Sequence, residues 1–362
     1  MEKSVRKHYI DGIRIVAILL LIPFHTARIY DYYPFYIKDD QSMILQLFAI
    51  FLSQWRMPIL FLVSGVGTYF ILRSRSNRAF IHDRLKRLLI PFIFAVLVIV
   101  PPQGYYAALS KGIIPATTSY WEYYPTFFTF DLSQIDGFKG TFTPAHMWFI
   151  LFLVVFSLIS IMVFRFIQKR ESMLTSSTPS WFLYVLIIPI FITDIALLGM
   201  EFNPFYYFTF FLYGACIVKE TELERMMVKE RGRLLILALV SMSAVLFLYW
   251  LHIKNGVAIP LVIFTLLQSI TAFAWIFAML ANFKTYMNKK NKWITSVNMK
   301  VFTIYILHQT LIVAIGFYMQ KLSISIWSQF ILINLLTFIS IGLVYFLFIK
   351  HFAVVKTLFG AK

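Results

Sequence analysis

Long apolar stretches alternate with short polar connections along this chain. A helix needs about 20 mostly apolar residues to cross the hydrocarbon core of a membrane. The stretches that reach or approach this length are 10–30, 44–72, 88–109, 146–167, 181–199, 204–218, 234–252, 258–282, 300–319 and 326–349. The pattern predicts an all-α fold: a polytopic transmembrane helix bundle of about ten spans, forming a single domain over residues 1–362. The second stretch is long for one span, and the sixth is short.

The composition agrees with a chain that lies mostly in lipid. Of its 362 residues, 60% are hydrophobic and 14% are charged, whereas a soluble domain carries about 25% charged residues. The first apolar stretch leads directly into the others and lacks a small-residue cleavage site. We therefore expect it to be the first span and not a cleaved signal peptide.

Lysine and arginine are distributed unequally between alternate connections. They are frequent at the two chain ends and in connections 73–87, 165–170, 219–233 and 284–292. The opposite connections contain only Arg28, Lys38, Lys111, Lys139, Lys254 and Lys321. Because basic residues are enriched in cytoplasmic loops, we expect both termini in the cytoplasm. The net charge of +17 then reflects loops that contact anionic lipids, and we expect no nucleic-acid partner.

Two ionisable residues lie within the first span, DGIRIVAILLLIPFHTARIY. If this helix is continuous, Arg14 and His25 are about 17 Å apart along its axis and project from nearly the same face. Arg14 then lies near the cytoplasmic end and His25 toward the outer side. Ionisable side chains are costly inside a membrane, which makes both residues candidates for function.

Arg56 is the corresponding cation of the second span, in the block SQWRMPILFLVSG. Its height along the helix matches that of His25, so the two residues meet if their helices are adjacent. A neighbouring guanidinium would favour the neutral imidazole, which is the form that a general base needs. Pro58 is expected to kink this helix.

Further candidates lie in later spans. Arg84 and Arg87 are three residues apart, on one face of a helix at the cytoplasmic entrance. They would suit a phosphorylated ligand, or they are only basic residues that keep this end of the helix in the cytoplasm. His146 and His308 are candidates for substrate binding, although each could also be a packing residue. The lone Cys216 allows neither an internal disulfide nor a cysteine metal site, and we predict no metal.

The longest connection, 110–145, is predicted to lie outside the cell. It is rich in Tyr, Trp, Phe, Thr and Pro, within KGIIPATTSYWEYYPTFFTFDLSQIDGFKGTFTPA. Its aromatic side chains could stack against sugar rings. They could equally lie among lipid headgroups.

Several blocks resemble the membrane acyltransferase-3 family: DGIR and IPFH in the first span, WRMPILFLVSG, RLKRLLIP, HMWFILFL and IYILHQ. The resemblance covers nearly the whole chain, is strongest in the first three spans, and is closest to glucan-modifying members. It implies transfer of an acyl group from cytoplasmic acyl-CoA to a hydroxyl of an extracytoplasmic glycan or lipid-linked sugar. His25 matches the essential histidine, as general base or transient acyl carrier. Arg14, Arg84 and Arg87 match basic positions where the phosphates of coenzyme A would enter.

The sequence thus predicts an O-acyltransferase of the cell membrane with a short acyl group, acetyl or succinyl. We expect no permanently bound cofactor, with acyl-CoA acting as donor substrate and membrane lipids as surroundings. The alternative is a transporter or exporter of a small amphipathic molecule, in which the same charged residues line a path. A third class, a non-catalytic sensor or scaffold, does not explain why Arg14 and His25 lie within a membrane span.

Overall fold

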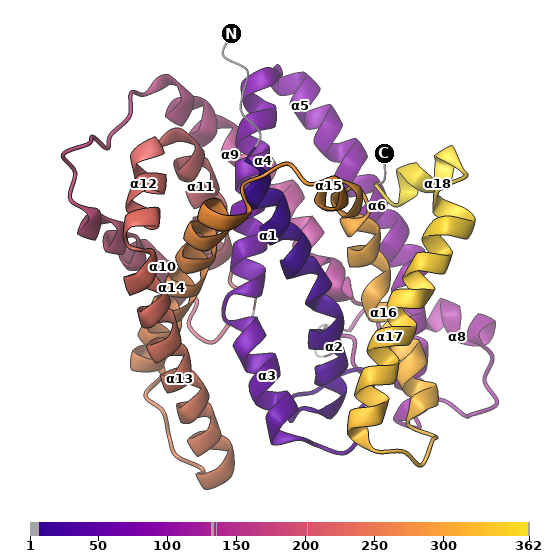
Figure 1. Cartoon of the computed structure of the whole chain (residues 1–362). Coiled ribbons are helices and arrows are strands. Elements are labelled where there is room, and N and C mark those ends of the chain that lie inside the picture. Colours follow the sequence, from indigo (N-terminus) through magenta and orange to yellow (C-terminus); the bar gives the residue numbers. More distant parts are fainter. Residues whose placement is uncertain (1–6, 132–133, 135, 201, 361–362) are drawn as a thin grey trace. The chain divides into compact units, whose positions relative to one another are not determined.

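The computed structural model describes residues 7–131, 134, 136–200 and 202–360 (Figure 1). All regular elements in these ranges are helices, and no strand is found in them. The predicted all-α fold is confirmed. Lys3 and Arg6, which contribute to the charge asymmetry, lie outside the described residues, as do three residues of connection 110–145.

Eight helical stretches of the described chain are long and apolar enough to cross a membrane. They are His8–Tyr30, Met43–Ser74, Asn77–Ser110, Ala145–Lys169, Arg231–Asn255, Leu261–Met287, Val301–Met319 and Ile326–Ile349. Their positions agree with eight of the predicted spans, so the chain is a multi-pass membrane protein. The predicted spans 181–199 and 204–218 correspond to the shorter helices Ser180–Ile195 and Pro204–Lys219. A helix of 16 residues reaches about 24 Å, less than the hydrocarbon thickness of about 30 Å.

The first span is not the continuous helix that we expected. It consists of α1 (His8–Leu19) and α2 (Leu21–Tyr30), which are separated at Leu20. Pro23 follows this break and has no backbone N–H to bond the preceding turn. The estimate that Arg14 and His25 share one helix face assumed an unbroken helix, and that assumption is wrong.

The helices form two compact units, each assembled from separated segments. Unit 1 comprises Met1–Ala17, Ile50–His82 and Val155–Asn298, and unit 2 comprises Ile18–Ala49, Asp83–Val154 and Met299–Lys362. The break at Leu20, between α1 and α2, lies shortly after Ala17, where the sequence first passes from unit 1 to unit 2. A single domain over residues 1–362 stays a prediction.

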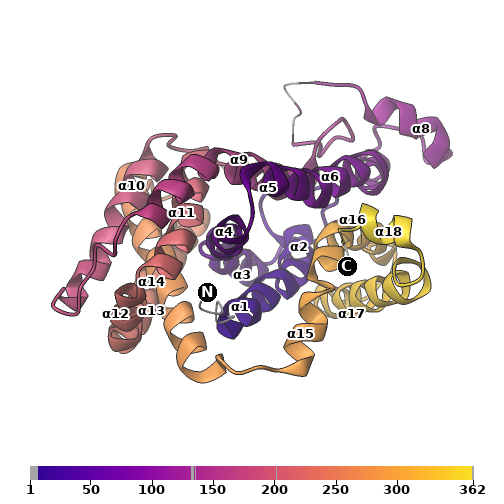
Figure 2. The same ribbon diagram turned by 90° about the horizontal axis from the view of Figure 1, so that it is seen from above.

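Unit 1 contains most of α1, the end of α3 (Met43–Ser53), α4 (Arg56–Ser74), most of α5 (Asn77–Arg84), the later part of α9 (Trp148–Lys169), η5 (Ser180–Leu186), α10 (Ile187–Ile195), α11 (Pro204–Lys219), α12 (Thr221–Lys229), α13 (Arg231–Asn255), α14 (Leu261–Met287) and α15 (Lys292–Asn298). Helices α13 and α14 pack side by side in both views (Figures 1 and 2).

Helices α4 and α11 come closer to each other than side chains at Gly65 and Gly214 would allow. A methyl group on Gly65 would collide with the carbonyl oxygen of Phe211, and one on Gly214 with that of Leu62. Small residues permit such close packing between membrane helices.

A buried carboxylate links the start of α1 to the rest of unit 1. Glu224 of α12 is 7% exposed and accepts hydrogen bonds from Lys7 and Lys284, both at 2.6 Å. The hydroxyl of Tyr9 donates to it at 2.5 Å. Burial raises the pKa of Glu224, but the hydrogen bonds and charges of Lys284 and Lys7 outweigh this, so its pKa is lower than usual. The charge is therefore retained, and it holds the beginning of α1 in place.

Unit 2 contains α2, most of α3, η1 (Leu85–Leu89), α6 (Ile90–Phe94), η2 (Ala95–Ile99), α7 (Pro101–Ser110), α8 (Tyr120–Phe127), η4 (Ala145–Met147), the first residues of α9, α16 (Val301–Met319), α17 (Ile326–Val344), η6 (Tyr345–Ile349) and α18 (Ala353–Leu358). Helix α16 packs against α2, α7 and α17. The absence of a side chain at Gly316 lets Ile29 and Ile37 approach α16 closely. Helix α16 therefore positions α2, α7 and α17.

The connection 110–145 belongs to unit 2 and contains α8. Ser119 and Glu122 form a capping box at the start of this helix. Lys111 donates to the carbonyl oxygens of Phe35 and Phe138, and burial lowers its pKa. Trp121 of α8 is 77% exposed, which fits a sugar-stacking and a headgroup position equally well.

Candidate active site

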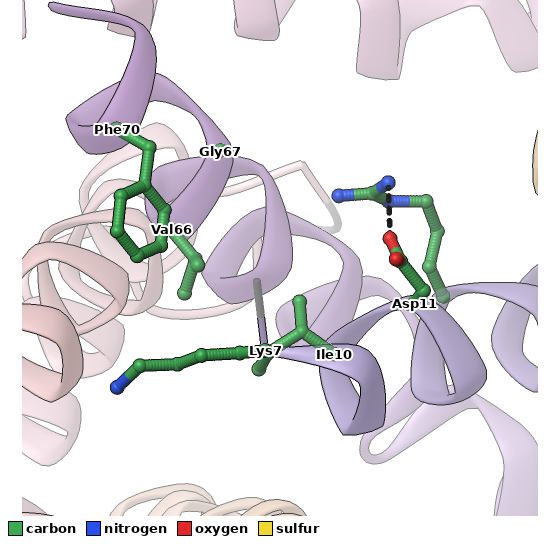
Figure 3. A pocket seen from close by; sticks show the side chains of 7 residues that line it. Lys7, Ile10, Asp11, Val66, Gly67 and Phe70 are labelled. Atoms are coloured by element: carbon green, nitrogen blue, oxygen red, sulfur yellow. Dashed lines mark hydrogen bonds and ion pairs between the residues drawn. The ribbon is translucent and has the colours of Figure 1, made fainter. Parts of the chain in front are cut away.

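A pocket of about 250 Å³ lies in unit 1 between α1 and α4 (Figure 3). It is lined by Lys7, Ile10, Asp11, Arg14, Val66, Gly67 and Phe70. Ile10, Val66 and Phe70 supply an apolar wall, while Lys7, Asp11 and Arg14 supply its charges. Gly67 leaves room in front of Arg14, because a Cβ at this position would lie 3.9 Å from Nη2 of Arg14.

Arg14 is held at the pocket by two polar neighbours. Its Nη1 lies 3.5 Å from Oδ1 of Asp11 and 3.4 Å from Oδ1 of Asn298, and the pair with Asp11 is drawn in Figure 3. Asn298 also donates to Oδ1 of Asp11 at 3.0 Å. These two contacts are long, hence weak, and 28% of the Arg14 side chain is exposed. Lys7 is bound to Glu224, so Arg14 is the cation best placed to bind an anionic group in the pocket.

Asp11 and Asn298 were missed by the sequence reasoning. Asp11 stands in the same DGIR block, one helical turn before Arg14, and this spacing could have identified it. Asn298 is far away in sequence and is brought to Arg14 by α15. No local pattern indicates that contact.

A cluster of three histidines forms the polar centre of unit 2. His25 comes from α2, His146 from η4 and His308 from α16. The ring centroids of His25 and His308 are 5.1 Å apart, and those of His146 and His308 are 5.0 Å apart. The sequence indicated each of these residues separately, and the structure brings them together.

Hydrogen bonds to carbonyl oxygens, which can only accept, determine the protonation of two of these rings. Nδ1 of His308 lies 2.6 Å from the carbonyl oxygen of Tyr305, so it carries the proton. Nε2 of His146 lies 3.0 Å from the carbonyl oxygen of Ile306 and carries the proton in that ring. The other nitrogen of His146 faces the amide of Gln103 at 3.5 Å. These tautomers are assigned from the network of hydrogen bonds.

A chain of neutral polar groups supports the cluster. Gln309 donates to Oε1 of Gln103 at 3.0 Å, and Gln103 donates to Thr310 at 2.7 Å. Thr310 in turn donates to the carbonyl oxygen of Ile99 at 2.7 Å. That carbonyl lies at the end of the π-helical η2, just before Pro101. Gln103 and Gln309 are amides inside apolar spans, a signal that could have been noticed in the sequence.

His25 is the accessible member of the cluster. His308 is fully buried and His146 is 6% exposed, whereas His25 is half-buried. Its ring stacks against Phe35 with centroids 6.1 Å apart, and it meets Phe24 edge-on at 4.9 Å. A substrate hydroxyl that reaches this cluster would therefore meet His25 first.

The remaining candidates are not among the residues that line the pocket. Arg56 is 3% exposed at the start of α4 in unit 1, and its predicted approach to His25 of unit 2 stays a prediction. Arg84 ends α5, and Arg87 lies in the π-helical η1, so their spacing is not that of an α-helix as we assumed. Nε of Arg87 forms an ion pair with Asp83 at 2.9 Å, with 45% of its side chain exposed.

Within the part of the chain that the structure describes, no group of three or more His, Cys, Asp or Glu side chains is placed to hold a metal ion.

Comparison with known families defines the class of protein. A family model described as an acyltransferase domain matches residues 7–349, nearly the whole chain. The chain belongs to this family and is a multi-pass membrane acyltransferase, which confirms the predicted resemblance.

The chain is also similar to proteins named glucans biosynthesis protein C. Those from Salmonella paratyphi B (strain ATCC BAA-1250 / SPB7), Salmonella heidelberg (strain SL476) and Salmonella agona (strain SL483) are each 28% identical to it over 167 residues. The match covers 46% of this chain and 41% of each relative. The resemblance to glucan-modifying members of the family is confirmed. No solved structure matches the chain significantly.

Proposed function

We propose that this acyltransferase moves a short acyl group, acetyl or succinyl, from cytoplasmic acyl-CoA to a hydroxyl of a glycan or lipid-linked sugar outside the cell. The observation that carries the proposal is His25, half-buried beside two buried histidines within a membrane protein of this family. The name of the relatives, glucans biosynthesis protein C, supports a glucan-like acceptor.

His25 acts on the acceptor in this reaction. A neutral imidazole nitrogen of His25 takes the proton as the hydroxyl oxygen attacks the thioester carbonyl carbon. The carbon–sulfur bond then breaks, and the proton passes from the imidazolium to the departing thiolate, giving the ester and coenzyme A. In a two-step variant, a nitrogen of His25 attacks the thioester carbon, and the carbon–sulfur bond breaks to release the thiolate of coenzyme A. The hydroxyl oxygen then attacks the acyl-imidazole, the carbon–nitrogen bond breaks, and the proton of the hydroxyl ends on the thiolate.

Arg14 binds the donor in this proposal. Its partly exposed guanidinium lies in a pocket of about 250 Å³ with an apolar wall, and guanidinium pairs well with phosphate oxygens. Ligand pockets usually measure about 300–1,000 Å³, so this one would take a part of acyl-CoA, such as one phosphate group. Arg84 and Arg87 would contact other phosphates at the cytoplasmic surface.

The test compares the surface glycans of cells that contain the intact protein, the His25→Asn variant or no protein. Mass spectrometry should detect a mass increment of one acetyl or succinyl group per acylated hydroxyl only with the intact protein. Purified protein in liposomes should consume acyl-CoA in parallel and release coenzyme A. Movement of a substrate across the liposome without consumption of acyl-CoA would instead support the transporter.

A further inference from the structure

The span Asn77–Ser110 contains two consecutive prolines that interrupt its hydrogen bonds. Pro101 and Pro102 follow Leu97 by four and five residues, the spacings that bond a carbonyl oxygen in an α-helix and in a π-helix. Neither proline has an N–H, so neither can donate to the carbonyl oxygen of Leu97. The hydroxyl of Tyr124 in α8 donates to this oxygen at 2.9 Å. Helix α8 therefore supplies a hydrogen bond that the two prolines withhold from the span.

The chain after Ser110 turns back along the same span before it forms α8. The hydroxyl of Tyr105 donates to the carbonyl oxygen of Thr118 at 2.9 Å, and Tyr124 then reaches the level of Leu97. The distance from Leu97 to Ser110 along a helix is about 20 Å, at 1.5 Å per residue. Helix α8 therefore lies beside the membrane-crossing part of the chain and not beyond its end.

Contact with α7 determines which side of α8 stays exposed. A Cβ at Gly104 of α7 would lie 2.3 Å from the hydroxyl oxygen of Tyr123 and 3.1 Å from Cδ2 of Phe127. The missing side chain thus lets these two residues pack closely against α7, and both are buried. Trp121, one turn away, is 77% exposed.

The exposed side of α8 continues a lipid-facing surface of the span. Ile93, Leu97 and Val98 are exposed by 43–49%, and apolar side chains exposed on a membrane span face lipid. Tyr124 is bonded to Leu97 of this surface, and its ring centroid is 6.3 Å from that of Trp121. Trp and Tyr are the residues enriched where spans meet lipid headgroups.

We propose that Tyr120, Trp121 and Tyr124 form a lipid-binding surface, which inserts α8 into the membrane leaflet nearer Ser110. Sugar stacking fits the same rings less well. The rings of Tyr120 and Tyr124 are each inclined to that of Trp121 by 64°, so the three rings do not form a flat platform for a sugar chain. The hydroxyl of Tyr124 is already bonded to the span.

Spin labels test where this surface lies. In a Cys216→Ser background, Trp121→Cys carries a nitroxide label, and the protein is placed in liposomes of phosphatidylcholine and phosphatidylglycerol. Collisions with oxygen, which dissolves in lipid, should be several-fold more frequent relative to those with a water-soluble nickel complex than for a label at Lys139→Cys. Lys139 is the matched control, because it is an exposed charged residue of the same connection.

A third label separates lipid from sugar. Thr126→Cys lies in α8 at an exposed position and leaves the three rings in place. Its spectrum in liposomes should not change when a soluble glucan oligosaccharide is added. None of these measurements requires acyl transfer, so their outcome is separate from that of the proposed function.

The hydrogen bond to Leu97 gives an independent test. Lipid has no donor to replace the hydroxyl of Tyr124, so Tyr124→Phe should lower the thermal unfolding midpoint in lipid nanodiscs. If water reached this carbonyl oxygen, a water molecule would replace the hydroxyl and the midpoint would stay. Tyr286→Phe is the control, because Tyr286 is 68% exposed, and it should keep the parent midpoint.

The inference is overturned if the label at Trp121→Cys meets the nickel complex as often as the label at Lys139→Cys. A parent-like midpoint in Tyr124→Phe would also overturn it. A spectrum of Thr126→Cys that changes with the glucan would assign the surface to sugar instead of lipid.

Discussion

Replacing Gly67 by leucine should block the pocket beside Arg14 without disturbing α4. A Cβ at this position would lie 3.9 Å from Nη2 of Arg14, an ordinary van der Waals distance. The remaining side-chain atoms would extend into a pocket of only about 250 Å³. Leucine also favours a helix over glycine by about 0.5–1 kcal/mol, so the helix should form normally.

The size of the effect follows from the contact that would be lost. A hydrogen bond to a charged group is worth about 1.5–3 kcal/mol, and about 1.4 kcal/mol corresponds to a factor of ten. If a phosphate of the donor binds Arg14, KM for acyl-CoA should rise about ten- to a hundredfold in Gly67→Leu. kcat at saturating donor should change much less, because His25 is not among the residues that line the pocket.

Initial rates of coenzyme A release, measured over a range of acyl-CoA concentrations in liposomes, test this expectation. Gly67→Ala should behave like the parent, since its methyl group stays at ordinary contact distance. Gly232→Leu is the matched control, because a Cβ at that helical glycine meets nothing within 4 Å. A parent-like KM in Gly67→Leu would show that the pocket does not bind the donor.

Three further predictions concern the scaffold. Gly65→Val should lower the thermal unfolding midpoint in detergent, because the carbonyl of Phe211 leaves no room for a side chain. The free energy of unfolding should fall by an amount toward the upper end of the range for overpacking, about 1–3 kcal/mol. Gly342→Val should leave the midpoint unchanged, because a Cβ there meets nothing within 4 Å. The pKa of Glu224 is lowered from its ordinary value of 4.5, so its charged form stabilises the fold above that pH, and this stability is lost as the pH falls through the lowered pKa. Glu224→Gln should therefore unfold at a lower temperature near neutral pH, and its unfolding midpoint should depend less on pH in the acid range. An unchanged dependence of the midpoint on pH would contradict the assignment. In a Cys216→Ser background, a membrane-impermeant thiol reagent applied outside should label a cysteine at Lys139 and not one at Ser76, and the opposite labelling would overturn the predicted topology.

Hydropathy was enough to predict most of the fold. Membrane spans are specified by local composition, since every backbone polar group must be satisfied within its own helix. The break at Leu20 was not predicted, because Pro23 stands inside an apolar run that gives no other sign of interruption. The π-helical turn around Arg87 was missed for a similar reason: periodicity arguments assume α-helical spacing throughout.

The candidate site was predictable only residue by residue. His25, His146 and His308 are visible as ionisable groups within apolar spans. Their meeting depends on how α16 packs with α2 and on the position of η4, which long-range contacts determine. The same holds for Asn298 beside Arg14. Sequence spacing identifies the chemical groups, and packing decides which of them act together.

The central claim is that His25 performs acyl transfer. The most direct measurement is transfer of labelled acyl groups from acyl-CoA to glycan by purified protein in liposomes, with the parent compared with His25→Asn. Asparagine keeps a polar side chain but cannot accept a proton near neutral pH. The transfer rate should fall by about a hundredfold or more, while acyl-CoA binding persists. Acylation of glycan by His25→Asn at the parent rate would contradict the account.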